Sequence, residues 1–273
     1  MAGRDLTSIR SPRVKAARRL AKRAFRRRER RFLAEGPQAV REALELPGVL
    51  LELFTTTEAE ARHADLITRA EGAGTPVLRV GGEAMAELAQ TVTPQGLLAV
   101  CAFVDVALAK ALAPPPRLVT VLAQVRDPGN AGTVLRTADA AGSDLVIFTD
   151  ASVDPYNGKC VRASAGSLFH VPIVIGPRFE SLIQALRADG LTVLAADGAA
   201  QRTLDGALDD GLLARPTAWV FGNEAWGLPD DVLRLVDDVV SVPIYGRAES
   251  LNLATATAVC LYSSARAQRR RER

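Results

Sequence analysis

Apolar and polar positions follow two different periods along the chain, and the second half shows the clearer pattern. From residue 118 onward, short apolar runs typical of buried strands are separated by segments whose apolar residues recur at helical spacing. The strand-like segments are residues 118–125, 144–150, 191–197, 217–223 and 239–244, and the helical segments are residues 131–142, 181–190, 229–237 and 251–270. Near-continuous apolar strands alternating with helices predict an α/β fold whose parallel sheet is covered on both faces.

The first hundred residues show the same mixture on a smaller scale. Short apolar runs and amphipathic patterns alternate over residues 32–46, 50–74, 76–90 and 96–104. Three consecutive prolines follow at 114–116, and proline cannot continue a helix. We therefore expect a small α/β domain over residues 1–105, an extended proline-rich linker over residues 106–117, and a larger α/β domain over residues 118–273.

Positive charge is concentrated at one end of the chain. Residues 13–31 contain eleven lysines and arginines against the single acid Glu29, whereas the whole chain has a net charge of only +3. The tail, residues 269–273, adds four arginines against Glu272, so the long middle of the chain is acidic. A solvated basic helix would be the plain explanation, but a run of one sign repels itself and favours a phosphate partner such as RNA or DNA.

Within the basic segment the apolar residues predict one helix with a narrow docking stripe. These residues recur near helical spacing, and they are Val14, Ala17, Leu20, Ala21 and Phe25. We expect the cations to surround this stripe and to face solvent.

Composition and the scarce reactive residues exclude several classes of protein. A length of 273 residues with 48% apolar and 24% charged residues is that of a globular chain with more than one core. Cys101, Cys160 and Cys260 have no metal-binding spacing, and His63 and His170 are far apart, so we expect no metal site and no disulfide framework. No segment has the apolar length of a membrane span or a signal peptide, so a cytoplasmic protein is expected.

Three polar loops follow strands of the larger domain, and the first is "RDPGNAGTVLR" after residues 118–125. Pro128 and Gly129 make a turn, Asn130 is suited to cap the following helix, and Arg136 projects from that helix. The third loop, in "VPIYGRAESLN", places Ser250 or Asn252 where either could cap the last helix. Taken singly, the first loop and the third loop can each be explained by helix capping alone.

The second loop, "GNEAWGL", follows residues 217–221. Gly222 and Gly227 permit close approach of the backbone to a ligand, with Glu224 between them. Leu228 and Pro229 stand where a nucleotide triphosphate loop needs lysine and serine or threonine, so that type of loop is excluded. Loops at the carboxyl ends of parallel strands are where such sheets bind ligands.

Together, and in this order, the three loops resemble the signature motifs of the SpoU (TrmH-like) branch of the SPOUT RNA methyltransferases. The matching stretches are "GNAGTVLRTADAAG", "VFGNEAWGL" and "VPIYGRAESLNLATATAVCLY". The stretches "RRERRFLAEGPQAVREAL" and "TVTPQGLLAV" also resemble the ribosomal-protein-like substrate-binding domain that many members carry. The resemblance implies S-adenosylmethionine-dependent methylation of a ribose 2′-hydroxyl by a homodimer whose catalytic domain, here residues 118–273, contains a deep trefoil knot.

The resemblance also implies roles for individual residues. By position in the motifs, the expected catalytic residues are Asn130, Arg136, Glu224, Ser250 and Asn252. The expected cofactor-binding residues are Phe221, Gly222, Asn223, Gly227, Val242, Ile244 and Leu251. Because the sulfonium already activates the methyl group, such a site needs alignment rather than a metal. A guanidinium is a poor base, so we expect Arg136 to hold a phosphate and polarise the hydroxyl.

The expected partner is RNA. The candidate RNA-binding residues are Arg13, Lys15, Arg18, Arg19, Lys22, Arg23, Arg26 and Arg27 of the basic segment, and Lys159 and Arg162 of "DPYNGKCVRASAGSLFHVPI". For the last two, local hydrogen bonding within a loop is an equal explanation. Ribosomal RNA suits a separate N-terminal domain, transfer RNA is an alternative, and a catalytically silent RNA-binding or assembly factor is a further one.

Overall fold

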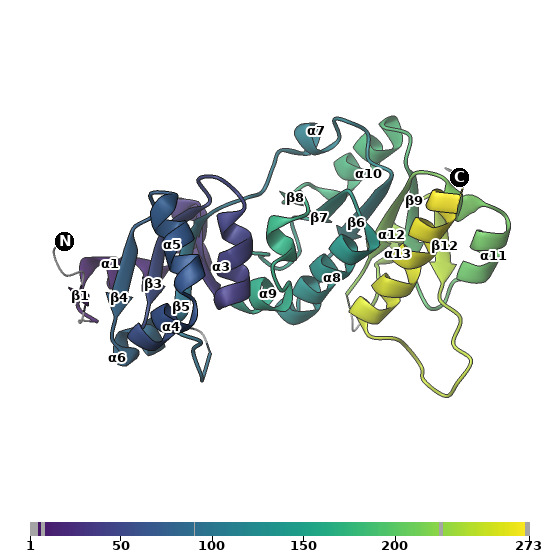
Figure 1. Cartoon of the computed structure of the whole chain (residues 1–273). Coiled ribbons are helices and arrows are strands. Elements are labelled where there is room, and N and C mark those ends of the chain that lie inside the picture. The colour runs from purple at the N-terminus through teal and green to yellow at the C-terminus, as the bar shows by residue number, and fades with distance from the viewer. Residues whose placement is uncertain (1–4, 7–8, 90, 224–225, 271–273) are drawn as a thin grey trace. The chain divides into compact units, whose positions relative to one another are not determined.

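The computed structural model describes residues 5–6, 9–89, 91–223 and 226–270 (Figure 1). They form two compact units: the first comprises Met1–Val104 and Tyr156–Phe169, and the second comprises Asp105–Pro155 and His170–Arg273. The first stretch of the first unit ends at Val104, whereas the sequence predicts a first domain over residues 1–105. The grouping of Tyr156–Phe169 with the first unit does not follow from the sequence pattern, which places it inside the larger domain.

The proline-rich segment is not the extended spacer that we expected. It contains the short helix α7 (Leu108–Ala111), and Leu112 is buried in the core of the second unit. The backbone N–H of Val106 donates to the carbonyl oxygen of Ile173 at 2.9 Å. Apolar residues on both sides of α7 pack against that core, so burial orders the part of the segment that precedes the three prolines.

The second unit contains a seven-stranded sheet in the order β10-β12-β9-β11-β6-β7-β8, with every neighbouring pair parallel (Figure 1). Its strands are β6 (Leu118–Leu122), β7 (Leu145–Phe148), β8 (Ile173–Ile175), β9 (Thr192–Ala196), β10 (Arg202–Thr203), β11 (Thr217–Phe221) and β12 (Asp238–Ser241). Its other helices are α8 (Pro128–Ala141), α10 (Phe179–Ala188), α11 (Leu204–Asp209), α12 (Asp230–Leu233) and α13 (Leu253–Arg270), with the 3-10 turn η2 (Leu212–Ala214). The expected parallel α/β fold is confirmed.

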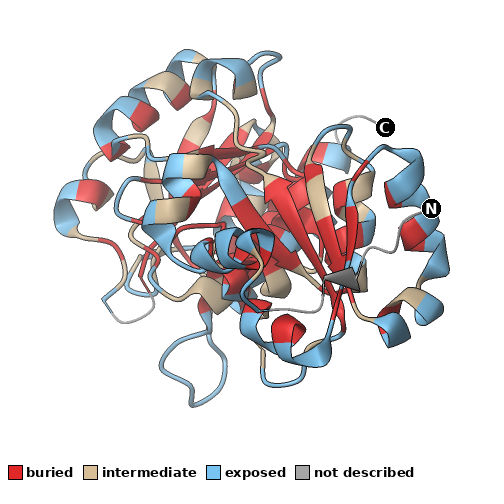
Figure 2. Cartoon of the chain, turned by 90° about the vertical axis from the view of Figure 1, so that its left-hand side faces the viewer, coloured by how far each residue is buried: buried red, intermediate tan, exposed pale blue. Residues whose placement is uncertain are grey.

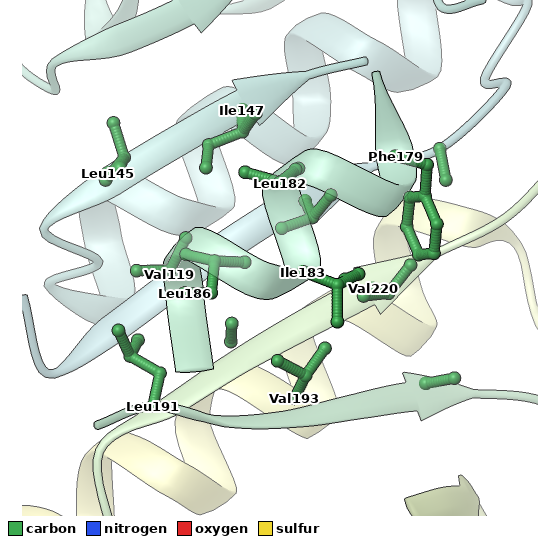
Figure 3. Packing of buried hydrophobic residues seen from close by; sticks show 14 of the residues in the cluster. Val119, Leu145, Ile147, Phe179, Leu182, Ile183, Leu186, Leu191, Val193 and Val220 are labelled. Carbon is green, nitrogen blue, oxygen red and sulfur yellow. The ribbon is translucent and has the colours of Figure 1, made fainter. Parts of the chain in front are cut away.

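Alternating strand residues explain why helices cover both faces of this sheet. On β6 and β11, Val119 and Val220 point toward one face, where they pack against Leu182 and Ile183 of α10 (Figure 3). On the other face Trp219 is fully buried, and its indole Nε1–H donates to Ser264 Oγ of α13 at 2.8 Å. Strands buried on both sides must be apolar throughout, which is the pattern of the sequence.

Four adjacent strands of this sheet bring the three polar loops to one edge. Strands β12, β9, β11 and β6 are consecutive neighbours and parallel, so the loops that leave their carboxyl ends lie on the same side. We call the carboxyl ends of β12, β9, β11 and β6, with the loops that follow them, the carboxyl edge. The first, second and third polar loops leave β6, β11 and β12 respectively.

The first unit is built on a five-stranded mixed sheet in the order β1-β4-β3-β5-β2, in which β5 is antiparallel to β2 and β3. Its strands are β1 (Asp5–Leu6), β2 (Arg31–Glu35), β3 (Leu50–Thr55), β4 (Val77–Val80) and β5 (Leu97–Ala102). Its helices are α1 (Pro12–Arg19), α2 (Arg23–Glu29), α3 (Pro37–Leu44), α4 (Thr57–Arg62), α5 (Ala64–Gly72), α6 (Gly82–Leu88) and α9 (Gly158–Ala163), followed by the 3-10 turn η1 (Ser167–Phe169). Buried residues follow the strands and exposed ones the outer helix faces (Figure 2).

The basic segment forms two short helices, α1 and α2, and not the single helix that we predicted. We call residues 12–29 the basic hairpin. Val14, Ala17 and Leu20 are buried in the core of the first unit, as the stripe predicts, but Ala21 is exposed. The chain turns at Lys22, whose backbone is extended, and Arg26 satisfies the carbonyls left open by that turn.

The segment Tyr156–Phe169 packs inside the first unit through aromatic and glycine contacts. The Tyr156 ring stacks on Phe103 with centroids 3.8 Å apart, and its hydroxyl accepts a hydrogen bond from the Val104 N–H at 2.8 Å. Gly166 has φ +99°, and a Cβ there would lie 2.5 Å from Glu42 Cγ. A glycine is therefore required where this segment passes α3.

Two further expectations concern membrane spans and the trefoil knot. Within the described ranges, no helix has the length and hydropathy to cross a membrane. The trefoil knot implied by the resemblance stays a prediction.

Candidate functional site

In the first polar loop, Asp127 caps the N-terminus of helix α8. We had expected Asn130 to be the cap. The Asp127 carboxylate accepts a hydrogen bond from the Asn130 backbone N–H at 2.8 Å, and Pro128 occupies the first position of α8. Proline is favoured at that position, which makes the preceding residue the cap. The Asn130 side chain is therefore not needed to cap α8.

The third loop brings Asn252 to Asn130. The Nδ2 of Asn252 donates to Oδ1 of Asn130 at 3.2 Å, across 122 positions of sequence. On its other side, Asn252 Oδ1 accepts from the Ala254 N–H at 2.9 Å and so caps α13. This bond fixes which end of the amide faces Asn130. Of the five expected catalytic residues, these two are linked directly.

The second loop is shaped by its glycines. The backbones of Asn223 and Gly227 exchange two hydrogen bonds of 2.9 Å, and Gly227 has φ +67°. A Cβ on Gly222 would lie 2.5 Å from the Gly227 carbonyl oxygen, so no side chain fits there. The Asn223 side chain donates to the carbonyl oxygen of Gln124 at 3.2 Å, which joins this loop to the first one. The expected acid Glu224 lies outside the described residues.

The segment Val242–Leu251 is the most open part of the carboxyl edge. Ile244 is 38% exposed and Leu251 37%, and Ser250 is also exposed. The backbone groups of this segment form no hydrogen bonds with the backbone of other described residues. Its side-chain tether is Tyr245, whose hydroxyl donates to Asp205 at 2.9 Å. The segment thus offers unpaired backbone groups beside apolar side chains.

These groups fit the expected cofactor, S-adenosylmethionine. Gly222 and Gly227 let the second loop close on itself at the carboxyl edge, while Ile244 and Leu251 present apolar contact area. A ligand with a flat apolar ring and polar edges is recognised by this combination of apolar surface and backbone donors and acceptors. Phe221 as a whole is 1% exposed, so its side chain is closed to a ligand.

Arg136 lies on the exposed side of α8, about 9 Å along the helix from Asn130 at 1.5 Å per residue. Within the part of the chain that the structure describes, its guanidinium has no hydrogen-bond or ion-pair partner. An unpaired guanidinium beside a ligand edge is suited to a phosphate or a hydroxyl oxygen. The structure does not bring Arg136 into contact with Asn130 or Asn252.

Sequence reasoning missed Asp197, at the carboxyl end of β9. Its Oδ1 accepts from the Ala199 N–H at 2.8 Å, and a Cβ on Gly227 would lie 3.3 Å from its Oδ2. Asp197 therefore stands beside the second loop. The available signal was a carboxylate directly after a buried strand, the position at which parallel sheets place ligand-binding groups.

The expected RNA-binding cations of the basic hairpin differ in their surroundings. Arg13, Lys15, Arg19, Lys22, Arg23 and Arg27 are exposed. Arg18 is exposed and pairs with Glu87 at 2.6 Å. Arg26 is only 3% exposed, and its Nη1 donates to the carbonyl oxygens of Leu20 at 2.9 Å and Ala21 at 2.7 Å. The assignment of Arg26 to RNA binding is corrected: its guanidinium holds the turn of the hairpin.

Of the two candidates in the segment Tyr156–Phe169, Lys159 is exposed and Arg162 is half-buried. Arg162 Nη1 lies 3.3 Å from Glu35 Oε2, so its charge is paired within the first unit. Glu35 lies 127 positions from Arg162 in sequence, so this pairing is a long-range contact and not the local bonding that was the alternative.

The cysteines are structural. All three are buried, and none of them forms a disulfide. Burial raises the pKa of the Cys260 thiol to about 12 and raises that of Cys101 still further, so neither is a thiolate at neutral pH. In the described part of the chain, no three His, Cys, Asp or Glu side chains are grouped to hold a metal ion.

Comparisons with known proteins agree with this geometry. The model of the SpoU rRNA Methylase family matches residues 117–262, and that of the MRM3-like substrate binding domain matches residues 11–99. The chain is 34% identical to the 23S rRNA (guanosine(2553)-2′-O)-methyltransferase RlmP of Bacillus subtilis, over 95% of this chain and 98% of that protein.

Two solved structures resemble the whole chain. An AdoMet-bound rRNA methyltransferase from Sinorhizobium meliloti has a TM-score of 0.82 and 31% identity, covering 97% of this chain and 98% of its own. The SpoU methyltransferase AviRb from Streptomyces viridochromogenes, in complex with AdoMet, has a TM-score of 0.82 and 26% identity, covering 96% and 100%. With more than half of its length matched by the family model and a relative at 34% identity, this chain belongs to the SpoU rRNA methylase family.

Proposed function

We propose that the protein transfers the methyl group of S-adenosylmethionine to a ribose 2′-hydroxyl of ribosomal RNA. The observation that carries the proposal is the bond between Asn252 and Asn130, which joins two motif loops at the carboxyl edge. The paired glycines of the second loop lie at the same edge. Relatives named as 23S rRNA 2′-O-methyltransferases support the reaction and the class of RNA.

The cofactor supplies an electrophilic methyl group, so the protein needs to align it with the attacking oxygen. The backbone of Phe221, Gly222 and Asn223 and that of the segment Val242–Leu251 hold the cofactor. Asn252 positions the Asn130 amide at the edge of this surface, with its own amide fixed by capping α13.

Arg136 binds the phosphate next to the reacting ribose and donates to the 2′-oxygen. This contact favours the negative charge that develops on that oxygen as its proton passes to solvent water and the oxygen takes the methyl group. Glu224 and Ser250 complete the proposed set of site residues. The guanidinium acts as a donor and not as a base, because it has N–H donors and no acceptor site.

The protein acts as a homodimer in this proposal. Val259 and Tyr262 of α13 are 38% and 53% exposed, and Trp226 at the carboxyl edge is 57% exposed. Large apolar side chains on a surface helix are typical of a surface that a second subunit covers. Cytoplasmic placement, where ribosomal RNA is accessible, agrees with three buried cysteines that form no disulfide.

The test is incubation with labelled S-adenosylmethionine and separate pools of ribosomal and transfer RNA, followed by mapping of 2′-O-methyl positions. Ribosomal RNA from cells that lack the protein is the substrate, because it carries the unmodified site. We expect label at one ribose position of ribosomal RNA. Label in transfer RNA alone would overturn the choice of RNA, and cofactor binding without label in either pool would favour a silent assembly factor.

A further inference from the structure

Two arginines of the basic hairpin pack on one aromatic ring. The guanidinium carbon of Arg19, at the end of α1, lies 4.1 Å from the centroid of the Phe25 ring, and that of Arg28, in α2, lies 4.9 Å away. The two arginines are nine positions apart and belong to different helices. The turn at Lys22 is what allows both to reach Phe25.

The contact changes what these cations can bind. A guanidinium over an aromatic ring is attracted to the ring face and loses part of its rotational freedom before any ligand arrives. Arg19 and Arg28 remain exposed, and the side chain of Arg28 is 62% exposed although it also lies 2.9 Å from Glu29. A planar, exposed and partly ordered guanidinium can stack on a nucleobase, which a lysine cannot do.

A third arginine has the same surroundings at the end of the hairpin. Arg30 lies 4.7 Å from the centroid of Phe103, and it adopts a left-handed backbone with φ 53°. Phe103 in turn stacks on Tyr156. Left-handed backbone is unfavourable for a residue with a Cβ, so the conformation of Arg30 has a cost in free energy.

We propose that Arg19, Phe25 and Arg28 form a stacking site for an unpaired nucleobase, so that the basic hairpin binds a looped or single-stranded segment of RNA. Point charges suffice for the backbone of a duplex, whose bases are stacked on one another and closed to side chains. Unpaired bases offer a π face, and stacking on planar side chains is how proteins commonly hold them. This inference rests on the proposed function only in taking RNA as the partner.

The test compares two RNA probes with the full-length protein. One is a short unpaired RNA oligonucleotide, and the other is the same oligonucleotide annealed to its complement. The double substitution Arg19→Lys and Arg28→Lys keeps both charges and removes both planar groups. A matched control replaces two exposed arginines away from the hairpin, Arg41→Lys and Arg62→Lys.

We expect the hairpin substitution to weaken binding of the unpaired RNA about tenfold, as the loss of one stacked base would. Duplex affinity and the salt dependence of both affinities should be unchanged, because the number of charges is unchanged. Phe25→Leu, which keeps an apolar side chain and removes the ring, should reproduce the loss. Circular dichroism of each variant shows that the fold is retained.

Equal loss on both probes, or loss on neither, would overturn the stacking site. Tight binding of polyglutamate that falls with the same substitution would also overturn it, since the surface would then serve an acidic protein. Methylation is measured separately with ribosomal RNA. If the wild-type protein methylates no RNA but the hairpin variants lose unpaired RNA selectively, the stacking site stands and the proposed function fails.

Discussion

The basic hairpin and the carboxyl edge are revealed by the sequence in opposite ways. Charge density marks the hairpin as an RNA-binding segment, yet it treats all nine of its cations alike. The structure separates them, with Arg26 turned inward and Arg19 laid on Phe25. At the carboxyl edge the motifs single out individual residues, and the structure supplies the link between Asn252 and Asn130. Charge thus locates a surface, whereas motif spacing identifies side chains.

The sharpest difference between the two regions is expected at Arg136. If one guanidinium holds the phosphate and the 2′-oxygen, Arg136→Ala should slow methyl transfer at least about a hundredfold, the usual effect of removing one donor from a developing oxyanion. Binding of S-adenosylmethionine should be unchanged. Single-turnover methylation and cofactor calorimetry measure the two effects.

The control for Arg136 is Arg178→Ala, an exposed arginine at the start of α10. It should methylate at the wild-type rate. If Arg136→Ala also methylates at that rate while binding RNA normally, the guanidinium has no role in the transfer step.

The hairpin cations should divide by position and not by charge. Arg26→Ala removes one charge and leaves the carbonyls of Leu20 and Ala21 without their donor, so unfolding should become easier by about 2 kcal/mol. Arg27→Ala removes the same charge from an exposed position and should change stability by less than about 0.5 kcal/mol. Urea unfolding of the full chain measures both.

The salt dependence of RNA affinity should respond in the opposite way, with an effect of Arg27→Ala and none of Arg26→Ala. Arg27→Ala should lower the slope of log affinity against log salt by about one, whereas Arg26→Ala at a temperature where it is folded should leave that slope unchanged. A stable Arg26→Ala protein with a reduced salt slope would return Arg26 to the RNA-binding set. Deleting the hairpin would not answer the question, because Val14, Ala17 and Leu20 belong to the core.

Local pattern predicts much of the second unit because its strands are buried on both faces. Four of the five expected strand segments contain a strand of the sheet and the fifth, residues 239–244, overlaps β12, while each of the four expected helical segments contains or overlaps a helix. The short helix α9 and the strand β8 were not predicted, since six and three residues carry too little periodicity. Tyr156 packs against the rings of Phe32 and Phe103. Both partners lie far from Tyr156 in sequence, and no spacing rule reveals such contacts.

In the candidate site, too, the sequence only partly predicts which residues cap the helices. Asp127 and Asn130 are both suitable caps, and Pro128 between them was the signal that favours Asp127. The break in the basic segment had no such signal, because no glycine or proline stands between Arg19 and Arg23. It depends on Arg26 folding back onto two carbonyl oxygens, which is a tertiary effect.

A substitution at Asn252 separates capping from positioning within one side chain. Asn252→Asp keeps an oxygen that accepts from the Ala254 N–H, and its charge is favourable at a helix N-terminus, so stability should be unchanged or slightly raised. The donor to Asn130 Oδ1 is lost, and two oxygens then face each other. Methyl transfer should fall about tenfold, the effect of one lost hydrogen bond.

The informative comparison is with Asn252→Ala, which loses both bonds and should lose stability as well as activity. Thermal unfolding and single-turnover methylation give the two readouts. If Asn252→Asp transfers methyl groups as fast as the wild type, the link to Asn130 does not order the site, and capping is the whole role of this residue.

The smallest expected effect concerns the tether of the segment Val242–Leu251. The hydrogen bond to Asp205, followed by the charge of that carboxylate, raises the pKa of Tyr245 above its ordinary value of 10.0. A raised pKa means that the protonated hydroxyl is favoured in the folded protein, so the tether is fully present below pH 10 and is lost as the pH rises through the raised pKa. Asp205→Asn removes the carboxylate and should return the Tyr245 pKa toward the ordinary value, as followed by carbon NMR of the labelled tyrosine ring. The ring is exposed and the bond is surrounded by water, so methylation near neutral pH should change little in Tyr245→Phe. If the Tyr245 titration is the same in Asp205→Asn and in the wild type, the hydrogen bond to Asp205 does not hold this segment, and other contacts must do so.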